Sequence, residues 1–445
     1  MQGVESGSKG VERLIYCEMN YFSTRDKSKR GFALADAAFM GLAPDGGLFL
    51  PERIPQVDMQ RVEQLAAVSY ADMALYLAQQ IFDDVDAEAL ERVVRDAYDF
   101  PIEMRALGDG LHTLELFHGP THAFKDFGAR FMGRMTGLLN DGGELVILTA
   151  TSGDTGSAVA HGFYGVEGVR VVILYPDGKV SPLQEAQMTT LGGNIHPLKV
   201  RGNFDDCQRM VKAMFRDEAL RREVRITSAN SINLLRWLPQ SFYYFYGYCV
   251  WKRMTGRDNP EVVVPSGNYG NLTAGMFARR MGLPLKGFVA ASNANDVVPE
   301  FLQTAEYRPR ASVQTVANAM DVGDPSNFER MMQLCGEDVA SLRGELRGFS
   351  CSDEEIRQAI AEIHENYGYL SDPHSAVGYL ATKALGVDGF YLSTAHAAKF
   401  GEVVEPSAGV APQLPKSLAE AVGKERKFLS IEAREEYLAS FLREM

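Results

Sequence analysis

The sequence of 445 residues lacks the features of exported, membrane-spanning and nucleic-acid-binding proteins. No stretch reaches the roughly 18 consecutive apolar residues of a membrane helix, and residues 1–10 are too polar for a signal peptide. No block of lysine or arginine could track a phosphate backbone, and the formal net charge is −13. We therefore expect a cytoplasmic protein without a membrane or nucleic-acid partner, in which a local pocket can still attract a small anion.

Cysteine is scarce, and its five occurrences are widely separated and never form a CxxC pair: Cys17, Cys207, Cys249, Cys335 and Cys351. This usage favours reduced thiols over a disulfide framework and provides no cluster of metal ligands. His118 and His122 have the spacing of a helical metal pair, but Gly119 and Pro120 between them break the helix that would align them. The sequence therefore predicts no metal site.

Core-forming residues are abundant, and their pattern changes along the chain. Hydrophobic residues make up 46% of the sequence, as in ordinary globular proteins. Residues 1–105 have mostly helical periodicity, whereas short β-branched runs alternate with helical stretches from residue 144 onward. Such runs predict parallel sheets covered by helices on both faces. The expected strands are 145–150, 169–175, 195–200, 224–227, 262–265, 286–291 and 389–394.

One lysine lies in a setting that disfavours its charge. A turn at Gly119-Pro120 precedes the apolar spacing of an amphipathic helix, with Lys125 in its first turn. Ala129 and Met132, the next residues on its face, are apolar, and a helix N-terminus repels positive charge. A neutral lysine amine is a nucleophile that commonly forms Schiff bases with carbonyl compounds. The alternative for this segment alone is a lysine whose head group reaches water.

A glycine-containing loop follows the expected strand 262–265 and leads into an expected helix. Its sequence is Ser266-Gly267-Asn268-Tyr269-Gly270-Asn271. Backbone N–H groups at such a helix start can bind a phosphate, and the helix dipole adds attraction. The loop lacks the GxGxxG and GK[ST] patterns, which argues against a dinucleotide or ATP. An ordinary turn between strand and helix is the alternative.

Two further loops follow expected strands, where parallel sheets place their ligand sites. Residues 151–157 concentrate hydroxyl and carboxyl groups beyond what one helix cap requires, so we expect them to bind a ligand such as a carboxylate. Residues 392–396 end a buried strand, where the Thr394 hydroxyl could meet a heteroaromatic nitrogen. Together with the lysine and the phosphate loop, these features meet the needs of pyridoxal 5'-phosphate.

The chain also closely resembles the threonine synthases, a family of fold-type II pyridoxal-phosphate enzymes. The similar stretches follow the family's order over nearly the whole length: 21–25, 41–49, 119–126, 151–156, 228–233, 267–271, 318–322 and 392–396. The resemblance implies an α/β fold of two lobes with mainly parallel sheets flanked by helices. It implies a large cofactor-binding lobe of residues 106–143 and 261–400 and a small lobe of residues 144–260. A mainly helical N-terminal region (1–105) and a C-terminal cap (401–445) complete the expected division.

The resemblance also implies roles for individual residues. Lys125 matches the lysine that forms the Schiff base with pyridoxal phosphate and moves protons on the substrate. Thr394 matches the partner of the pyridine nitrogen, and the phosphate loop matches Gly267, Asn268, Tyr269, Gly270 and Asn271. The residues expected to bind substrate are Ser152, Gly153, Asp154, Thr155, Asn233 and Arg236.

Two of these assignments are less direct. Asp154 stands where many fold-type II relatives carry asparagine beside the cofactor's 3′-oxygen, so this sequence departs from their pattern. Arg236 could bind the substrate phosphate, because arginine binds phosphate in a bidentate manner, or it could belong to a structural ion pair.

The implied reaction converts O-phospho-L-homoserine and water into L-threonine and phosphate, by γ-elimination followed by β-addition of water. A fold-type II threonine or serine dehydratase is one alternative, and it would release a 2-oxo acid and ammonia. A non-catalytic threonine-synthase-like protein is the other, and retention of Lys125 argues against it. The stretch 43–47 favours threonine synthases over the dehydratases, which share the lysine but lack this segment.

Overall fold

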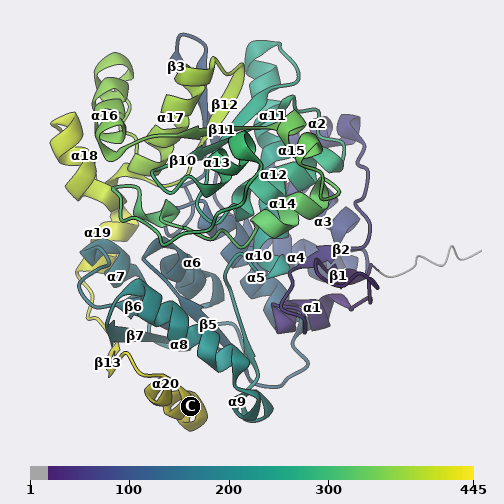
Figure 1. Cartoon of the computed structure of the whole chain (residues 1–445), viewed down its shortest axis with the longest axis vertical. Helices are drawn as coiled ribbons and strands as arrows, with labels where there is room; N and C mark the ends of the chain where they lie inside the picture. Colours follow the sequence, from purple (N-terminus) through teal and green to yellow (C-terminus); the bar gives the residue numbers. More distant parts are fainter. Residues whose placement is uncertain (1–18) are drawn as a thin grey trace, which may run out of the picture.

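Two mainly parallel sheets organise residues 19–445, the part of the chain that this computed structural model describes (Figure 1). The large sheet has the order β11 (Leu346–Ser350), β10 (Gly287–Ser292), β9 (Glu261–Pro265), β12 (Gly389–Ser393), β4 (Leu111–Glu115) and β3 (Glu103–Gly108). The small sheet has the order β13 (Leu429–Glu432), β7 (Ile195–Arg201), β6 (Val169–Pro176), β5 (Leu145–Ala150) and β8 (Ile226–Thr227). Only β3 runs antiparallel to its neighbour within these two sheets.

Helices flank both sheets, which confirms the predicted α/β fold of two lobes. In the first part of the chain they are α1 (Leu34–Met40), α2 (Met59–Val68), α3 (Tyr70–Ile81), α4 (Ala87–Ala97), α5 (Lys125–Leu139), α6 (Asp154–Phe163), α7 (Pro182–Thr189), α8 (Phe204–Arg216), α9 (Glu218–Glu223) and α10 (Leu234–Trp237). They continue as α11 (Phe242–Thr255), α12 (Gly270–Arg280), α13 (Val297–Thr304), α14 (Phe328–Leu334), α15 (Val339–Glu345), α16 (Asp353–Tyr367), α17 (Pro373–Leu385), α18 (Gly401–Ala408), α19 (Lys416–Val422) and α20 (Glu435–Glu444). The 3₁₀ helices are η1 (Leu238–Ser241), η2 (Asn318–Met320) and η3 (Ala397–Phe400).

The predicted amphipathic helix is α5, which lies between the two sheets (Figure 1). Its apolar residues Phe127, Phe131 and Met135 are fully buried, and the helix packs against α4, α6 and α10. Gly133 permits the close approach to α6, because a Cβ there would lie 2.1 Å from the carbonyl oxygen of Gly162. This packing fixes the start of α5, and with it Lys125, near the carboxyl ends of both sheets.

The expected N-terminal and C-terminal regions contain strands that the sequence did not predict. The N-terminal region contains α1 to α4, as predicted, but also an antiparallel pair of strands, β1 (Tyr21–Ser23) and β2 (Phe49–Pro51). The boundary expected at residue 105 falls inside β3. Within the expected C-terminal cap, α18 packs on α16, whereas β13 pairs in parallel with β7 of the small sheet and α20 packs on α8.

The missed edge strands have a common cause. β3 and β13 are largely exposed and lack the apolar runs that mark buried strands, and β11 contains Arg347 and Gly348.

Within residues 19–445, no helix combines the length and apolar character needed to cross a membrane.

Candidate active site

A cavity of about 2330 Å³ opens between the two sheets. Its wall contains nearly all the predicted site residues: Lys125, Ser152, Asp154, Thr155, Arg236, Gly267, Asn268, Tyr269, Gly270, Asn271 and Thr394. Gly153 and Asn233 are not part of this lining. The fold thus brings together side chains and turns from α5, from the loop after β5, from the loop after β9 and from the end of β12.

Lys125 begins α5 and is one of the residues that line this cavity. Its side chain is only 14% exposed, and Nζ lies 3.7 Å from Oδ2 of Asp154. Burial lowers the pKa of the Lys125 ammonium, Asp154 opposes this shift, and Lys399 and Arg236 add to it. The predicted bias toward a neutral, nucleophilic amine is therefore present, with burial as its main cause.

The segment before Lys125 is joined to the end of β12. The Phe124 N–H donates to the Thr394 carbonyl oxygen at 2.8 Å, and Ala123 forms an isolated antiparallel bridge with Ala395. The Thr394 N–H in turn donates to Oγ of Ser375 at 2.9 Å. These bonds fix the Lys125 and Thr394 backbones beside each other at the cavity wall.

Asp126 closes the turn that leads into α5. Its carboxylate accepts from the N–H of Thr121 at 2.9 Å and from the Thr121 hydroxyl at 2.6 Å. Burial raises the pKa of the Asp126 carboxyl to about 6, against the opposing effect of these two bonds. Asp126 therefore stabilises the turn through its bonds to Thr121. With a pKa of about 6, its carboxyl group loses its proton slightly below neutral pH.

The turn after β9 (residues 266–271), the candidate anion cradle, leads directly into the start of α12. Tyr269 has the left-handed φ of 59°, which turns the chain sharply into the helix. Gly267 fits tightly, because a Cβ there would lie 2.6 Å from Cα of Met320. The side chain of Asn268 is engaged elsewhere, with Nδ2 donating to Ser231 and Oδ1 accepting from Ser326.

Asn271 supplies the observation that points to a ligand here. Its Oδ1 accepts from the hydroxyls of Tyr243 and Tyr244, both at 2.6 Å. Its buried Nδ2 has no hydrogen-bond partner within the described residues. An unsatisfied buried donor at a helix N-terminus suits an anion such as the phosphate of pyridoxal phosphate. The cradle and the nearby lysine therefore fit this cofactor.

In the hydroxyl-rich loop after β5, some side chains stabilise the backbone and others line the cavity. Thr151 stabilises the loop, because its Oγ1 accepts hydrogen bonds from the N–H groups of Gly153 at 2.9 Å and Gly156 at 2.8 Å. Ser152 and Thr155 line the cavity. The surplus of polar groups noted in the sequence thus faces the space where a substrate would bind.

Asn233 and Arg236 lie in different environments. The Asn233 amide donates to the carbonyl oxygens of Ala38 at 2.7 Å and Ser228 at 3.1 Å, so it joins segments behind the cavity wall. Arg236 lines the cavity and donates to the carbonyl oxygens of Ala229 and Lys125. Burial lowers the pKa of Arg236 to about 10, and the structure of residues 19–445 gives it no ion pair. The alternative of a structural ion pair is therefore not what the structure contains.

Sequence reasoning missed Lys399 of η3, whose side chain is 0% exposed. Its Nζ lies 2.6 Å from Oδ1 of Asp154 and donates to the Thr121 carbonyl oxygen at 2.7 Å. Burial alone would raise the pKa of Asp154, but Lys399 and Lys125 together hold it below its ordinary value. The only signal in the sequence is a lysine between apolar residues, five positions after Thr394.

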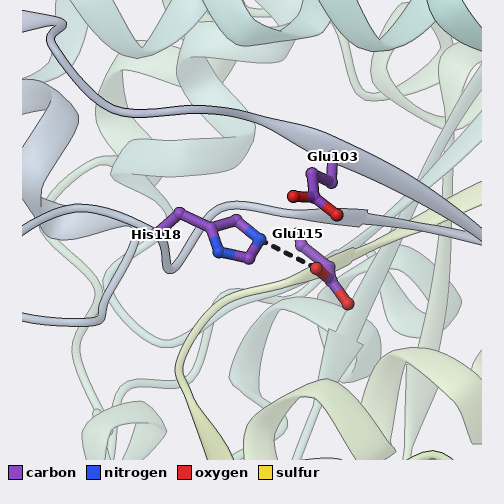
Figure 2. Close-up of side chains that lie close together, drawn as sticks. All are labelled: Glu103, Glu115 and His118. Atoms are coloured by element: carbon purple, nitrogen blue, oxygen red, sulfur yellow. Dashed lines mark hydrogen bonds and ion pairs between the residues drawn. The ribbon is translucent and has the colours of Figure 1, made fainter. Parts of the chain in front are cut away.

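A second cluster of ionisable groups lies at the edge of the large sheet (Figure 2). Nε2 of His118 lies 2.8 Å from Glu115, and the carboxylate of Glu103 is close to both. Arg105 lies 3.4 Å from the Glu115 carboxylate and 3.7 Å from that of Glu103, so a cation of the chain already lies beside both carboxylates. His122, the other histidine considered from sequence, contacts Ser417 instead.

Three family models match successive parts of the chain. The model described as pyridoxal-phosphate dependent enzyme matches residues 105–390. The threonine synthase N-terminal model matches residues 20–98, and the threonine synthase C-terminal model matches residues 375–441. The chain is 44% identical over 405 residues to threonine synthase from Serratia marcescens, covering 90% of this chain and 94% of that protein.

Solved structures agree with this likeness. The crystal structure of threonine synthase from Escherichia coli has a TM-score of 0.88 at 41% identity, covering 96% of this chain and 99% of that one. The structure of threonine synthase with bound pyridoxal phosphate from Brucella melitensis has a TM-score of 0.89 at 34% identity, with the same coverage. The similarity therefore extends over both sheets, and the family models span residues from 20 to 441.

Proposed function

The chain belongs to the threonine synthase family, and from this premise we propose how its residues convert O-phospho-L-homoserine and water into L-threonine and phosphate. It is a pyridoxal-phosphate-dependent lyase. The observation that carries the proposal is the shared cavity of one buried lysine amine and an anion cradle with an unsatisfied donor. The substrate class follows from the family, and the roles of the residues follow from their surroundings.

The residues that would hold the cofactor come from three segments. Lys125 would attach it covalently through Nζ, residues 267–271 and the first turn of α12 would bind its phosphate, and the Thr394 hydroxyl would meet its ring nitrogen. A hydroxyl partner leaves that nitrogen less fully protonated than a carboxylate would. When bound, pyridoxal phosphate withdraws electrons from carbanions that form on the amino-acid substrate.

The substrate would bind between this cradle and the loop after β5. Ser152 and Thr155, at the start of α6, would hold its carboxylate by hydroxyl and backbone N–H groups. Arg236 would contact its phosphate, because a buried guanidinium without a carboxylate partner favours an anion. Asn233 would stabilise the cavity wall instead of contacting the substrate, because its amide donates to the carbonyl oxygens of Ala38 and Ser228.

Lys125 would perform the proton transfers once its amine is free. Its Nζ would take the proton from the substrate Cα and then one from Cβ, so that phosphate can leave from Cγ with the electron pair of the broken bond. The same amine would then return protons to Cγ and, after water adds at Cβ, to Cα. A lysine with a lowered pKa suits both directions, because the acid and base forms are then both accessible. Such positioned proton transfer typically contributes about 10²- to 10⁴-fold to a rate.

Product analysis of the purified protein tests this function. With O-phospho-L-homoserine, we expect equal amounts of phosphate and threonine. Release of a 2-oxo acid and ammonia from threonine or serine, without phosphate, would identify a dehydratase instead. Absence of all products from a protein loaded with pyridoxal phosphate would favour a non-catalytic relative.

The proposed location is the cytoplasm. Support comes from Cys207, Cys249, Cys335 and Cys351, which are all free and buried. Cys17 lies outside the described residues. Fractionation of cells that express the chain would test this location.

A further inference from the structure

Lys399 is a buried charge that the proposed reaction does not use directly. Placing an ammonium in the protein interior is costly unless ionic and hydrogen-bonding partners surround it. Here the partners are the Asp154 carboxylate at 2.6 Å and the Thr121 carbonyl oxygen at 2.7 Å. Asp154 also faces Lys125, and Thr121 lies in the turn that leads into α5. Lys399 therefore contacts the same segments that position the reacting amine.

The Asp154 carboxylate lies between two lysines. Its Oδ1 contacts Lys399 and accepts from Nε2 of Gln184 at 2.9 Å, while Oδ2 faces Nζ of Lys125 at 3.7 Å. Lys399 follows β12 of the large sheet, and Asp154 follows β5 of the small sheet. The pair therefore links segments of the two lobes, and one carboxylate oxygen of Asp154 faces Lys125.

Charge neutrality in this buried group depends on the protonation of Lys125. The charged groups that act on Lys125 are Asp154 from α6, Lys399 from η3 and Arg236 from α10. Asp126, the next residue in α5, points its carboxylate at Thr121. With Lys399 in place, the Asp154 charge is already compensated, and Lys125 can lose its proton without leaving an unpaired buried carboxylate. Without Lys399, Asp154 would retain Lys125 as its counter-ion.

We propose that Lys399 is a positioning residue: it holds Asp154 ionised and aimed at Lys125, and this pair sets how much of the Lys125 amine is uncharged. The inference rests on the proposed role of Lys125 as the cofactor-binding lysine. It also accounts for an aspartate at position 154, where many fold-type II relatives carry asparagine. A carboxylate that Lys399 neutralises can occupy a place that otherwise suits a neutral amide.

The test measures the pKa of the Lys125 amine in the full chain freed of cofactor. Reductive methylation at a series of pH values, followed by peptide mass spectrometry, reports the uncharged fraction of that amine. Lys399→Gln should raise this pKa by about one unit, because a like charge is removed. Asp154→Asn should lower it by about 1 to 3 units, because the opposite charge within 4 Å is lost.

Comparison of variants separates this role from mere support of the fold. The double variant should give a pKa between those of the two single variants. Lys383→Gln is the matched control, because Lys383 is an exposed lysine that pairs with Glu362, and it should leave Lys125 unchanged. An unchanged Lys125 pKa in folded Lys399→Gln would overturn the inference.

A second comparison applies if circular dichroism shows that Lys399→Gln does not fold. The double variant with Lys399→Met and Asp154→Asn is then compared with Asp154→Asn alone, and the Lys125 pKa should be higher in the double variant. Equal values would overturn the inference. Borohydride reduction of the cofactor-loaded wild type checks separately whether Lys125 carries the cofactor, so failure of the proposed function and failure of the charge pair give different results.

Discussion

Substitution of Gly267 tests the anion cradle, because the structure leaves no room for even one methyl group there. A Cβ at position 267 would lie 2.6 Å from Cα of Met320 and 3.1 Å from the Ala319 carbonyl oxygen. Both neighbours are backbone atoms, so relief requires movement of the turn or of η2. We therefore expect Gly267→Ala to displace the backbone N–H groups that would bind the cofactor phosphate.

The expected size follows from the cost of overpacking, which is typically about 1–3 kcal/mol. If binding the cofactor requires the original turn, this cost weakens binding of pyridoxal phosphate by about 5- to 150-fold, since about 1.4 kcal/mol corresponds to a factor of ten. Equilibrium titration of the cofactor-free chain with pyridoxal phosphate, followed by absorbance, measures the change.

Gly344→Ala is the matched control for this experiment. Gly344 lies in α15, and a Cβ added there would meet no atom within 4 Å, so alanine should be tolerated. We expect its cofactor affinity to equal that of the wild type and its stability to be equal or slightly higher. Wild-type affinity in Gly267→Ala would refute the assignment of this turn as the phosphate site.

Three other substitutions test neighbouring parts of the site. Asn271→Asp keeps the acceptor for Tyr243 and Tyr244 but replaces the unsatisfied donor with negative charge, so cofactor affinity measured by titration should fall at least about tenfold. Arg236→Met should raise the KM for O-phospho-L-homoserine by about 10- to 100-fold, and an unchanged KM in steady-state kinetics would contradict the phosphate contact. Burial raises the Asp126 pKa from 3.8 to about 6, so its contribution to stability is complete below pH 4 and is lost as the pH rises through 6. Urea unfolding between pH 4 and pH 7 should therefore show wild-type stability falling by about 3 kcal/mol relative to Asp126→Asn, and a constant difference would contradict this.

Most central strands were predictable because they are apolar runs, but β4 (Leu111–Glu115), which contains His112, Thr113 and Glu115, was missed. The expected strand 169–175 corresponds to β6, and 262–265 corresponds to β9, both of which are buried almost throughout. Of the edge strands, β8 falls within the expected strand 224–227, whereas β3, β11 and β13 were not predicted. β13 is formed from the partly polar segment Leu429–Glu432, and its pairing with β7 depends on how the chain returns across the small sheet.

The site divides along similar lines. The loops around Lys125 and Gly267 carry local signals, namely a lysine at a helix start and a glycine-containing turn, and both line the cavity. Lys399 carries no such signal, because its role depends on its contact with Asp154, which begins α6 in the other lobe. Asn233 shows the reverse: its sequence context resembles a binding motif, but its amide bonds to the backbone of Ala38 and Ser228.

The central claim is that the Lys125 amine carries the cofactor. Borohydride reduction of the loaded protein, followed by peptide mass spectrometry, measures this directly. We predict that the added mass lies on Lys125 alone, and that Lys125→Ala loses both the label and phosphate release while circular dichroism shows an intact fold. A label on another lysine, or phosphate release by Lys125→Ala at the wild-type rate, would contradict it.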